Sequence, residues 1–503
     1  MKVLGSKKSI ISVSVAALLL SGCVSTDKIA LYSESRAGFA TVAEKTRIAT
    51  GGKQTVWIQN QAQNRDVFKR VHALTQNKMI SGDTAVQVAL LNNRELQAAY
   101  TDIGLGAADV WQQALPTNPK ASLSIMGIGS PDLGLFRTLE GMISNNIFAI
   151  ITQDRRVDLA DSKFRQAQLK AAFETLTLAT STRKAWIKAV SSTEMVTYLE
   201  RAKVTSDSAA QLALKLGESG AMPKVGQARE FAFDAELAGQ LASARLQAKL
   251  AKEELSQVMG LWGAEIDYLI PNALPPLPKS PILKDRIEKE ALMRRVDLQV
   301  SKLDLEITAK SFGLTQATRY VTDLDLSAGL GAERGIDTKY ELNGGNLVEN
   351  SKVNTPITPQ FQANFTIPIF DSGKARMRMA ELSYMKSANL LAAKAVNVRA
   401  EARQAYISYR SNYDIARHYR DTVLPLRKKV EEEAVLTYNG MISNTFELLT
   451  DTRNKINAEL AANTAKRDFW MSDAELTSAI YGGGRGMMKT TESATATGQS
   501  GGN

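Results

Sequence analysis

The order of apolar and polar residues predicts two long helical stretches, each broken once at glycine. A helix of about 60 residues is roughly 90 Å long, because each residue advances the chain by about 1.5 Å. No compact globular domain accommodates such a length. The first stretch runs from about 158 to 216, breaks between Gly217 and Gly226, and continues to about 259. The second runs from about 374 to 438, breaks at Asn439-Gly440, and continues to about 480.

Both stretches carry a narrow seam of small and apolar residues. Positions spaced by four, three and four residues face the same side of a helix, as they do in packed coiled coils. The seams are Leu178, Thr182, Ala185 and Ala189 in the first stretch and Val398, Ala402, Ala405 and Tyr409 in the second. Helices alone would also fit a free-standing coiled coil or a spectrin-like rod.

Four shorter regions alternate apolar and polar residues, which predicts strands with one apolar face. Two are clear, namely 323–330, with Leu324, Leu326, Ala328 and Leu330 on one face, and 361–369, with Phe361, Ala363, Phe365, Ile367 and Ile369. Two weaker ones lie at 121–129 and 142–152. The pattern suits membrane-spanning strands, although a half-buried soluble sheet has the same alternation. The segment 331–356, rich in Gly, Asn and charge, is expected to be an extracellular loop.

The chain reads as a duplicated unit. Residues 89–97 return as 291–299 at an offset of 202, with apolar, acidic and Gln positions in register, and Arg183-Lys184-Ala185-Trp186-Ile187 is echoed by Arg403-Gln404-Ala405-Tyr406-Ile407. This repeat predicts an N-terminal segment at 23–88, a first repeat at 89–264, a Pro-rich linker at 265–285, a second repeat at 286–481 and a disordered tail at 482–503. Each repeat is predicted to contain a helix, two strands and a long helical hairpin.

The first 22 residues have the charge order of a secretory signal peptide. Lys2, Lys7 and Lys8 precede an apolar run, and the segment ends Leu20-Ser21-Gly22-Cys23. This ending resembles the lipobox of bacterial lipoproteins, which implies that Cys23 is acylated and becomes the mature N-terminus. Val24 favours the outer membrane by the same analogy. An ordinary secreted protein with a chance cysteine at its cleavage point is the alternative.

Composition and charge exclude several classes of function. The 503 residues are 44% hydrophobic and 23% charged, enough for a core, and Cys23 is the single cysteine, which excludes an intramolecular disulfide. Removal of the signal leaves 59 basic against 52 acidic residues, mixed along the chain, so a nucleic-acid site is not predicted. No stretch of about 18 apolar residues follows Cys23, so a transmembrane helix is not expected.

Candidate chemistry is sparse, and no enzyme is predicted. His72 and His418 are the only histidines, and no phosphate-binding or paired metal-ligand motif is present. Met377, Met379 and Met385 would suit a soft metal, but helix packing by adaptable side chains is the preferred interpretation. No cofactor or metal site is predicted, apart from the lipid on Cys23.

Four strands per chain are too few to close a barrel, for which about eight is the smallest common number. An open sheet in lipid would leave its edges unpaired, at a cost of several kcal/mol per backbone group. The subunit is therefore expected to associate with further copies.

Four stretches resemble the TolC-type outer-membrane efflux family, and specifically its lipoprotein branch. They are Asn93 to Gln113 with Leu115-Pro116-Thr117-Asn118-Pro119, Ile367-Pro368-Ile369-Phe370-Asp371-Ser372-Gly373, Tyr438-Asn439-Gly440-Met441-Ile442-Ser443, and Phe446-Glu447-Leu448-Leu449. The resemblance implies an α+β membrane protein, mainly α, with an internal two-fold repeat. It would be a homotrimer, in which coiled-coil hairpins form a periplasmic α-barrel and four strands per chain contribute to a 12-stranded outer-membrane β-barrel.

The resemblance also implies that residues 23–88 contribute to an equatorial belt, and it implies a function and its sites. The chain would pass substrates from an inner-membrane pump across the outer membrane, with a periplasmic adaptor docked at tip turns around Gly220, Gly440, Met441 and Ser443. Where family members have Leu-Leu-Asp-Ala-Gln-Arg, this chain has Leu448-Leu449-Thr450-Asp451-Thr452-Arg453, with the acid one place later. Asp451 and Arg453 are candidates for a paired aperture gate, and a solvated helix face for both is the alternative. A lipid-anchored structural or adhesive coiled-coil protein is the alternative function.

Overall fold

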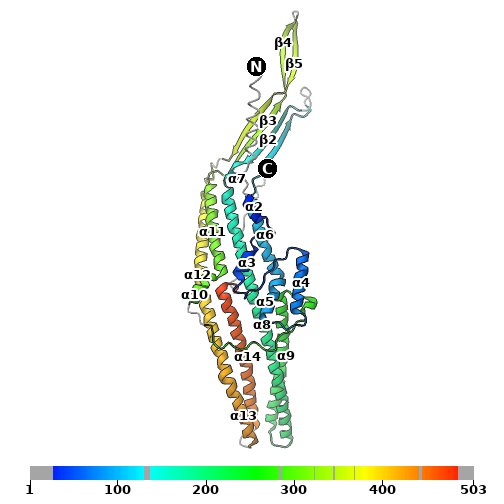
Figure 1. The fold of residues 1–503 in the computed structure, drawn as a ribbon, viewed down its shortest axis with the longest axis vertical. Helices are drawn as coiled ribbons and strands as arrows, with labels where there is room; N and C mark the ends of the chain where they lie inside the picture. Colours follow the sequence, from blue (N-terminus) through cyan, green and yellow to red (C-terminus); the bar gives the residue numbers. More distant parts are fainter. Residues whose placement is uncertain are drawn as a thin grey trace. The chain divides into compact units, whose positions relative to one another are not determined.

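The computed structural model describes residues 26–129, 136–282, 286–321, 323–343, 346–366, 369–440 and 445–484. They form two compact units, each built from three segments of the chain (Figure 1). Unit 1 comprises Met1–Gly38, Ile103–Ala167 and Ser301–Leu391, and unit 2 comprises Phe39–Asp102, Gln168–Val300 and Ala392–Asn503. Cys23 and the predicted signal peptide lie outside the described residues.

Helices dominate the described chain, as predicted. Those within unit 1 are α2 (Thr26–Tyr32) and α7 (Ile147–Ile151). Those within unit 2 are α3 (Phe39–Thr46), α4 (Gln61–Thr75), α5 (Gly82–Asn92), α9 (Lys224–Met259), η1 (Gly263–Ile266), α10 (Ile287–Arg294), η2 (Tyr419–Val423), α13 (Leu424–Asn439) and α14 (Thr445–Tyr481). The unit boundaries fall inside α6 (Arg94–Ala114), α8 (Gln153–Glu218), α11 (Val296–Ala317) and α12 (Lys374–His418).

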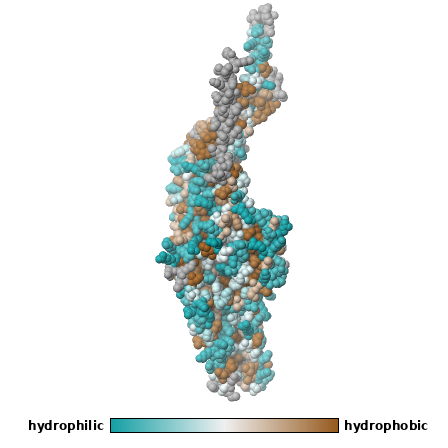
Figure 2. Space-filling view, viewed as in Figure 1, coloured by the Kyte–Doolittle hydropathy of each residue, from teal (hydrophilic) through white to brown (hydrophobic). Residues whose placement is uncertain are grey.

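Unit 1 contains an antiparallel sheet to which each repeat contributes two strands. Its order is β1 (Lys120–Met126), β2 (Thr138–Asn146), β3 (Leu324–Glu333) and β6 (Ile357–Phe365). Opposite residues in this register point to one face, so the pairs Leu123↔Gly141, Ile143↔Ala328 and Ala328↔Phe361 place apolar side chains on a common side. The predicted alternation and the four sheet strands are confirmed, and Figure 2 shows hydrophobic residues over this sheet.

The segment expected to be a loop, 331–356, instead forms mostly a second two-stranded sheet. Strands β4 (Gly335–Asn343) and β5 (Asn346–Asn354) pair in antiparallel register, with Ile336 opposite Val353. The Gly, Asn and charged residues that suggested a loop are compatible with a hairpin whose faces are both exposed. The expectation of an irregular loop is therefore wrong for most of this segment.

The predicted strand at 142–152 is displaced toward the N-terminus. Strand β2 ends at Asn146, whose side chain accepts a hydrogen bond from the backbone N–H of Ala149 (2.7 Å) and so caps helix α7. The apolar residues Ile147 to Ile151 are therefore helical. Strand β6 similarly begins at Ile357, four residues earlier than predicted, and Ile367 and Pro368 lie outside the described residues.

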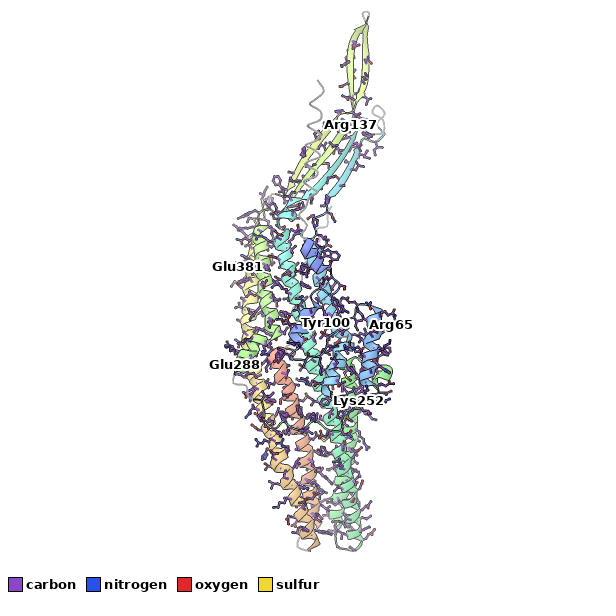
Figure 3. The ribbon with its side chains drawn as sticks, in the orientation of Figure 1. Arg65, Tyr100, Arg137, Lys252, Glu288 and Glu381 are labelled. Atoms are coloured by element: carbon purple, nitrogen blue, oxygen red, sulfur yellow. The ribbon has the colours of Figure 1, made fainter. Side chains whose placement is uncertain are left out.

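The core of unit 2 lies between the long helices, where the predicted seams are buried. Thr182, Ala189, Val398 and Ala402 have no exposed surface, and Tyr409 is buried too. Tyr100, labelled in Figure 3, packs its ring edge-on against Phe39 at 4.9 Å between centroids. The small seam residues let the helix backbones approach closely, which the coiled-coil interpretation required.

The two repeats share the same backbone at the corner between their short and long helices. Asn93, between α5 and α6, has φ −65° and ψ 123°, and Arg295, between α10 and α11, has φ −67° and ψ 118°. The backbone N–H of each donates to an alanine carbonyl four residues back, Ala89 at 2.9 Å and Ala291 at 3.0 Å. The offset of 202 residues found in the sequence therefore relates equivalent structural positions.

The polypeptide just after α14 is packed rather than loose. Gly482 and Gly483 are buried in unit 2, and a Cβ on Gly483 would lie 2.5 Å from the carbonyl carbon of Leu176. The predicted disordered tail therefore cannot begin at residue 482, and its remainder from 485 lies outside the described residues. Among the helices of the described chain, none is both long and apolar enough to cross a membrane.

Candidate functional site at the hairpin ends of unit 2

The two helical hairpins of unit 2 turn at the same end of that unit (Figure 1). The first turn joins α8 to α9. Gly220 adopts φ +78°, a left-handed conformation that favours glycine, and its N–H donates to the carbonyl of Gly217 (3.1 Å). Met222 N–H donates to the carbonyl of Leu216 (3.1 Å), and Pro223 precedes the first turn of α9. The turn occupies only the residues between Glu218 and Lys224, so it is shorter than the break predicted at 217–226.

The second turn, between α13 and α14, has a different geometry at its glycine. Gly440 donates its N–H to the carbonyl of Leu436 (2.9 Å) and has φ −77°, which any residue can adopt. Met441 and Ser443, predicted to belong to this turn, lie outside the described residues. The structure thus places Gly220 and Gly440 at turns, and gives a positive φ to Gly220.

The second hairpin is also interrupted in its first arm, between α12 and α13. Residues Tyr419–Val423 form a π-helical segment in which Leu424 N–H donates to the carbonyl of Tyr419. Pro425 follows directly and has no N–H to donate, so an uninterrupted α-helix would lose a hydrogen bond here. The helix predicted from 374 to 438 is therefore interrupted at this point, and Pro425 was the signal for it in the sequence.

Arg453 of α14 contacts α9 of the first hairpin. Its Nη2 lies 2.9 Å from Oε1 of Glu230 and donates to the carbonyl of Arg229 (3.1 Å), while its guanidinium lies 4.3 Å from the ring centroid of Phe233. Glu230 is only 4% exposed. Because a buried carboxylate needs a partner, this ion pair links the two hairpins near their turns.

Asp451 points into a different environment from Arg453. It lines a groove of about 390 Å³ between α13 and α14, together with Leu426, Lys429, Val430, Glu433, Ala434, Thr437 and Glu447. Residues two apart on a helix do not face each other, so an Asp451–Arg453 pair within one chain is not formed. Within one chain the partner of Arg453 is Glu230, and a pairing with Asp451 across copies of the chain stays a prediction.

Further ion pairs join neighbouring helices of the hairpins. Lys203 of α8 lies 2.9 Å from Asp234 of α9 and also contacts Asp207, and Lys455 of α14 lies 2.5 Å from Glu431 of α13. The hydrogen bonds from Lys203 to Asp207 and Asp234 raise the pKa of the Lys203 ammonium. These contacts are exposed or half-buried, so they specify the pairing of the helices more than they stabilise it.

The Pro-rich linker crosses the long helices and is held there by four side chains that the sequence analysis did not single out. Glu194 accepts from Leu274 N–H (2.8 Å), Trp470 Nε1 donates to the Pro275 carbonyl (3.1 Å), Tyr413 donates to the Lys279 carbonyl (3.0 Å), and the Tyr409 hydroxyl accepts from Ile282 N–H (3.1 Å). Lys466 pairs with Glu194 at 3.1 Å. The linker residues up to 282 are thereby an ordered part of unit 2, and 283–285 lie outside the described residues.

A buried ion network at the second-repeat corner was also missed. Arg295, 2% exposed, lies 2.8 Å from Asp297, which is 1% exposed and lies 2.6 Å from Lys394 of α12. Glu401 of α12 also pairs with Arg295. The one available signal was the charged pair Arg295 and Asp297 at positions where the first repeat has Asn93 and Glu95.

The described residues contain no cluster of three or more His, Cys, Asp or Glu side chains suited to a metal ion. His72 stacks on Phe68, with 6.2 Å between ring centroids, and His418 is the last residue of α12. Met379 and Met385, expected to pack between helices, are exposed in the single chain. The arrangement is one of helix contacts and turns, with no constellation for catalysis in the part of the chain that the structure describes.

Solved structures of outer-membrane channels share this fold. The chain is similar to the outer-membrane channel OprN (TM-score 0.63, 16% identity, 87% of this chain and 95% of that chain covered). It is also similar to CusC, whose structures concern folding and transmembrane channel formation (0.64, 15%, 81% and 94%), and to the CmeC outer-membrane channel of Campylobacter jejuni (0.58, 17%, 86% and 89%). The predicted fold class is confirmed: the chain has the fold of these channels over most of its length.

No family model and no curated protein sequence matches the chain.

Proposed function

We propose that the chain is a subunit of an outer-membrane channel that passes substrates delivered by an inner-membrane pump. The observation that carries the proposal is the shared fold, since the chain covers 95% of OprN and 94% of CusC, together with a sheet that is apolar on one face. An enzyme is not proposed, and no cofactor or nucleic acid is required.

A homotrimer is the proposed assembly, in which twelve strands form a β-barrel in the outer membrane. The sheet of one chain ends at strands β1 and β6, whose outer edges are open in the single chain. In lipid each unpaired backbone group costs several kcal/mol, so further copies must pair with these edges. The apolar residues Leu123, Phe361 and Phe365, all strongly exposed, would then face lipid.

We propose that the hairpin ends of unit 2 form the periplasmic tip, where an adaptor protein docks and the pore is narrowest. The turns at Gly220 and Gly440, with Met441 and Ser443, would present the docking surface. The groove that Asp451 lines has both apolar and charged walls, which suits a partner helix. Arg453 would help to hold the aperture closed through its ion pair with Glu230, and a ring of Asp451 side chains from the three copies would line the pore.

We also propose that Cys23 carries an N-terminal lipid that anchors the chain to the outer membrane, with the helices extending into the periplasm. The support is the lipobox-like Leu20-Ser21-Gly22-Cys23 and the absence of any other cysteine in the sequence. A Cys23→Ser variant should lose labelling by radioactive palmitate and still form trimers. Complete loss of trimers in that variant would argue against assembly driven by strands.

Single-channel recording in planar bilayers tests the proposed function. Purified protein should give discrete, repeatable conductance steps, and Arg453→Ala should open more often than the unaltered chain. The alternative, a lipid-anchored structural or adhesive coiled-coil protein, predicts membrane attachment without conductance. Neighbouring genes that encode an adaptor and a pump would indicate the class of the transported compound.

A further inference from the structure

Exposed apolar side chains gather in unit 1 where the sheet meets the helices. Tyr320 follows α11, Ile369 and Phe370 precede α12, and Ile151 ends α7. Their exposed fractions are 61%, 76%, 102% and 69%, respectively. These residues continue from the apolar face of the sheet, so in an inserted channel they would lie at the boundary between hydrocarbon and water.

Basic side chains occupy the same junction. The segments 149–156, 319–323 and 369–376 contain five basic residues and three acidic ones. We name the five the basic collar, which consists of Arg155, Arg156, Arg319, Lys374 and Arg376. Hydrophobic and hydrophilic residues lie side by side at this junction in Figure 2.

Backbone carbonyls fix the guanidinium groups of the basic collar. Arg319 Nε donates to the Ser372 carbonyl (3.1 Å), Arg155 Nη1 to the Gly313 carbonyl (3.2 Å), and Arg156 Nη2 to the Ala149 carbonyl (2.9 Å). A carbonyl carries no net charge, so these bonds orient the arginines and leave their positive charge uncompensated. Each guanidinium has five N–H donors, which leaves several for a ligand.

The acidic residues at the junction neutralise the basic collar only in part. Asp371, 65% exposed at its side chain, lies 3.7 Å from Arg376 Nε and accepts a hydrogen bond from Gly373 N–H. Asp323 accepts from the amide of Asn146 (2.5 Å). Asp371 thus pairs with Arg376, and the count of five basic against three acidic residues leaves the junction with a formal excess of positive charge.

We infer that the basic collar binds the phosphate headgroups of anionic phospholipids in the bilayer leaflet that borders helices α8 and α12. The inference rests on the proposed insertion of the sheet into a membrane. Arginine pairs with phosphate oxygens through two parallel hydrogen bonds, and the adjacent Phe370 and Ile369 would contact acyl chains. Exposed apolar residues lie beside the basic collar, which favours a phospholipid over free phosphate as the ligand.

The test compares insertion of the purified full chain into two kinds of vesicle, phosphatidylcholine alone and phosphatidylcholine with phosphatidylglycerol. We expect stronger binding to the anionic vesicles, and a loss of about fivefold in that preference for each collar residue replaced by glutamine. The variants are Arg319→Gln, Lys374→Gln and the double replacement. Lys374→Gln alters an exposed side chain, so it carries little risk to folding. Inorganic phosphate added to the solution should not compete.

Arg378→Gln is the matched control. Arg378 lies on α12 two residues beyond Arg376, and Glu381, labelled in Figure 3, holds it in an ion pair at 2.8 Å. The Arg378→Gln variant should therefore keep the preference for anionic vesicles nearly unchanged. Equal loss in Arg378→Gln and Lys374→Gln, full competition by phosphate, or no preference in the unaltered chain would each overturn the inference while channel insertion stands. Failure to insert into either vesicle would overturn the proposed function as well.

Discussion

The helix corners of the two repeats have nearly the same backbone conformation, but neutral amides hold the first corner and buried charges hold the second. At the first-repeat corner, neutral amides close the junction: Asn92 Nδ2 donates to the Gly260 carbonyl (2.7 Å), and Asn93 Nδ2 donates to the Val258 carbonyl (3.0 Å). At the second-repeat corner, Arg295 and Asp297 form a buried network with two side chains of α12. The extended residue at each corner keeps the same φ and ψ within a few degrees.

The duplicated fold is therefore held by its apolar pattern and backbone, whereas the polar contacts differ between the two repeats. Asn93 satisfies helix carbonyls at a modest energetic gain, about 1 kcal/mol per hydrogen bond. Arg295 and Asp297 pair away from water, so removal of either leaves the other charge buried, with a partly exposed counterion, Lys394 beside Asp297 or Glu401 beside Arg295. The second corner should therefore be the more sensitive of the two to a single substitution.

The largest effect is expected for Arg295→Ala, which should lower the free energy of unfolding by about 3–5 kcal/mol because Asp297 stays buried without its arginine. The matched change Asn93→Ala should cost only about 1–3 kcal/mol. Thermal unfolding followed by helical circular dichroism in one detergent measures both. An Asn93 variant less stable than the Arg295 variant would break the comparison.

A double replacement sharpens that comparison. Arg295→Met combined with Asp297→Leu should be less destabilising than Arg295→Ala, because the remaining Lys394 and Glu401 side chains are 22% and 41% exposed and can reach water. A double variant as unstable as the single one would show that packing, and not charge, dominates the corner.

The next largest effect concerns the link between the hairpins. Arg453→Ala should cost about 1.5–3 kcal/mol, since it leaves Glu230 buried without a cation. Arg245→Ala is the control, because Arg245 forms a similar 2.8 Å contact with Glu200 between side chains that are 56% and 49% exposed, where about 0–1 kcal/mol is expected. Equal shifts in the melting temperatures of the two variants would contradict the role given to burial.

The two turn glycines differ in backbone conformation, so we expect the same substitution to destabilise the chain at one turn and not at the other. Gly220→Ala should cost about 1–2 kcal/mol, because φ +78° is unfavourable for a residue with a Cβ even though no atom lies within 4 Å of the added carbon. Gly440→Ala at φ −77° should change stability little. Guanidinium titrations of the two variants provide the measurement, and a larger loss at Gly440 would be inconsistent with the turn geometry.

The smallest effect concerns a contact of α8, the long helix of the first repeat. Tyr32 donates to Asp161 (2.6 Å), and burial, together with the hydrogen bond and charge of Asp161, raises the pKa of Tyr32 from 10.0 to about 12. The neutral hydroxyl is favoured in the folded chain, so this contact is complete below pH 10 and is lost as the pH rises toward 12. Tyrosinate absorbance should report the late titration, and Tyr32→Phe should lower its amplitude by one tyrosine, since burial also raises the pKa of Tyr268 to about 12.

Sequence patterns predicted the features that depend on local periodicity. The seam at Thr182, Ala189, Val398 and Ala402 is buried, and the apolar alternation near Leu326 and Phe361 forms one face of the sheet. These signals are strong because burial repeats along one element with a fixed period. The tip turns at Gly220 and Gly440 were found because glycine interrupts a long helical pattern.

Contacts between distant segments could not be predicted in this way. Arg453 and Glu230 are 223 residues apart, and Glu194 bonds the linker at Leu274, 80 residues away. A single charged residue on a helix has the same local pattern whether it pairs across the fold or faces water. The end of β2 was misplaced for a related reason, since one capping bond from Asn146 overrides the strand preference of the isoleucines that follow.

The central claim is that strands β1 and β6 pair between copies of the chain. The test uses three double-cysteine variants in a Cys23→Ser background. Each variant has cysteine in place of Ser122 of β1 and of one residue of β6, which is Gln360, Gln362 or Asn364. The purified variants are oxidised and analysed on a non-reducing gel. Within one chain β2 and β3 separate these strands by about 14 Å, too far for a disulfide, whereas a Ser144 and Ser327 cysteine pair should close internally. The account predicts cross-linked dimers and a closed trimer for one of the three combinations. Cross-linking of none of them, with the internal control closed, would contradict it.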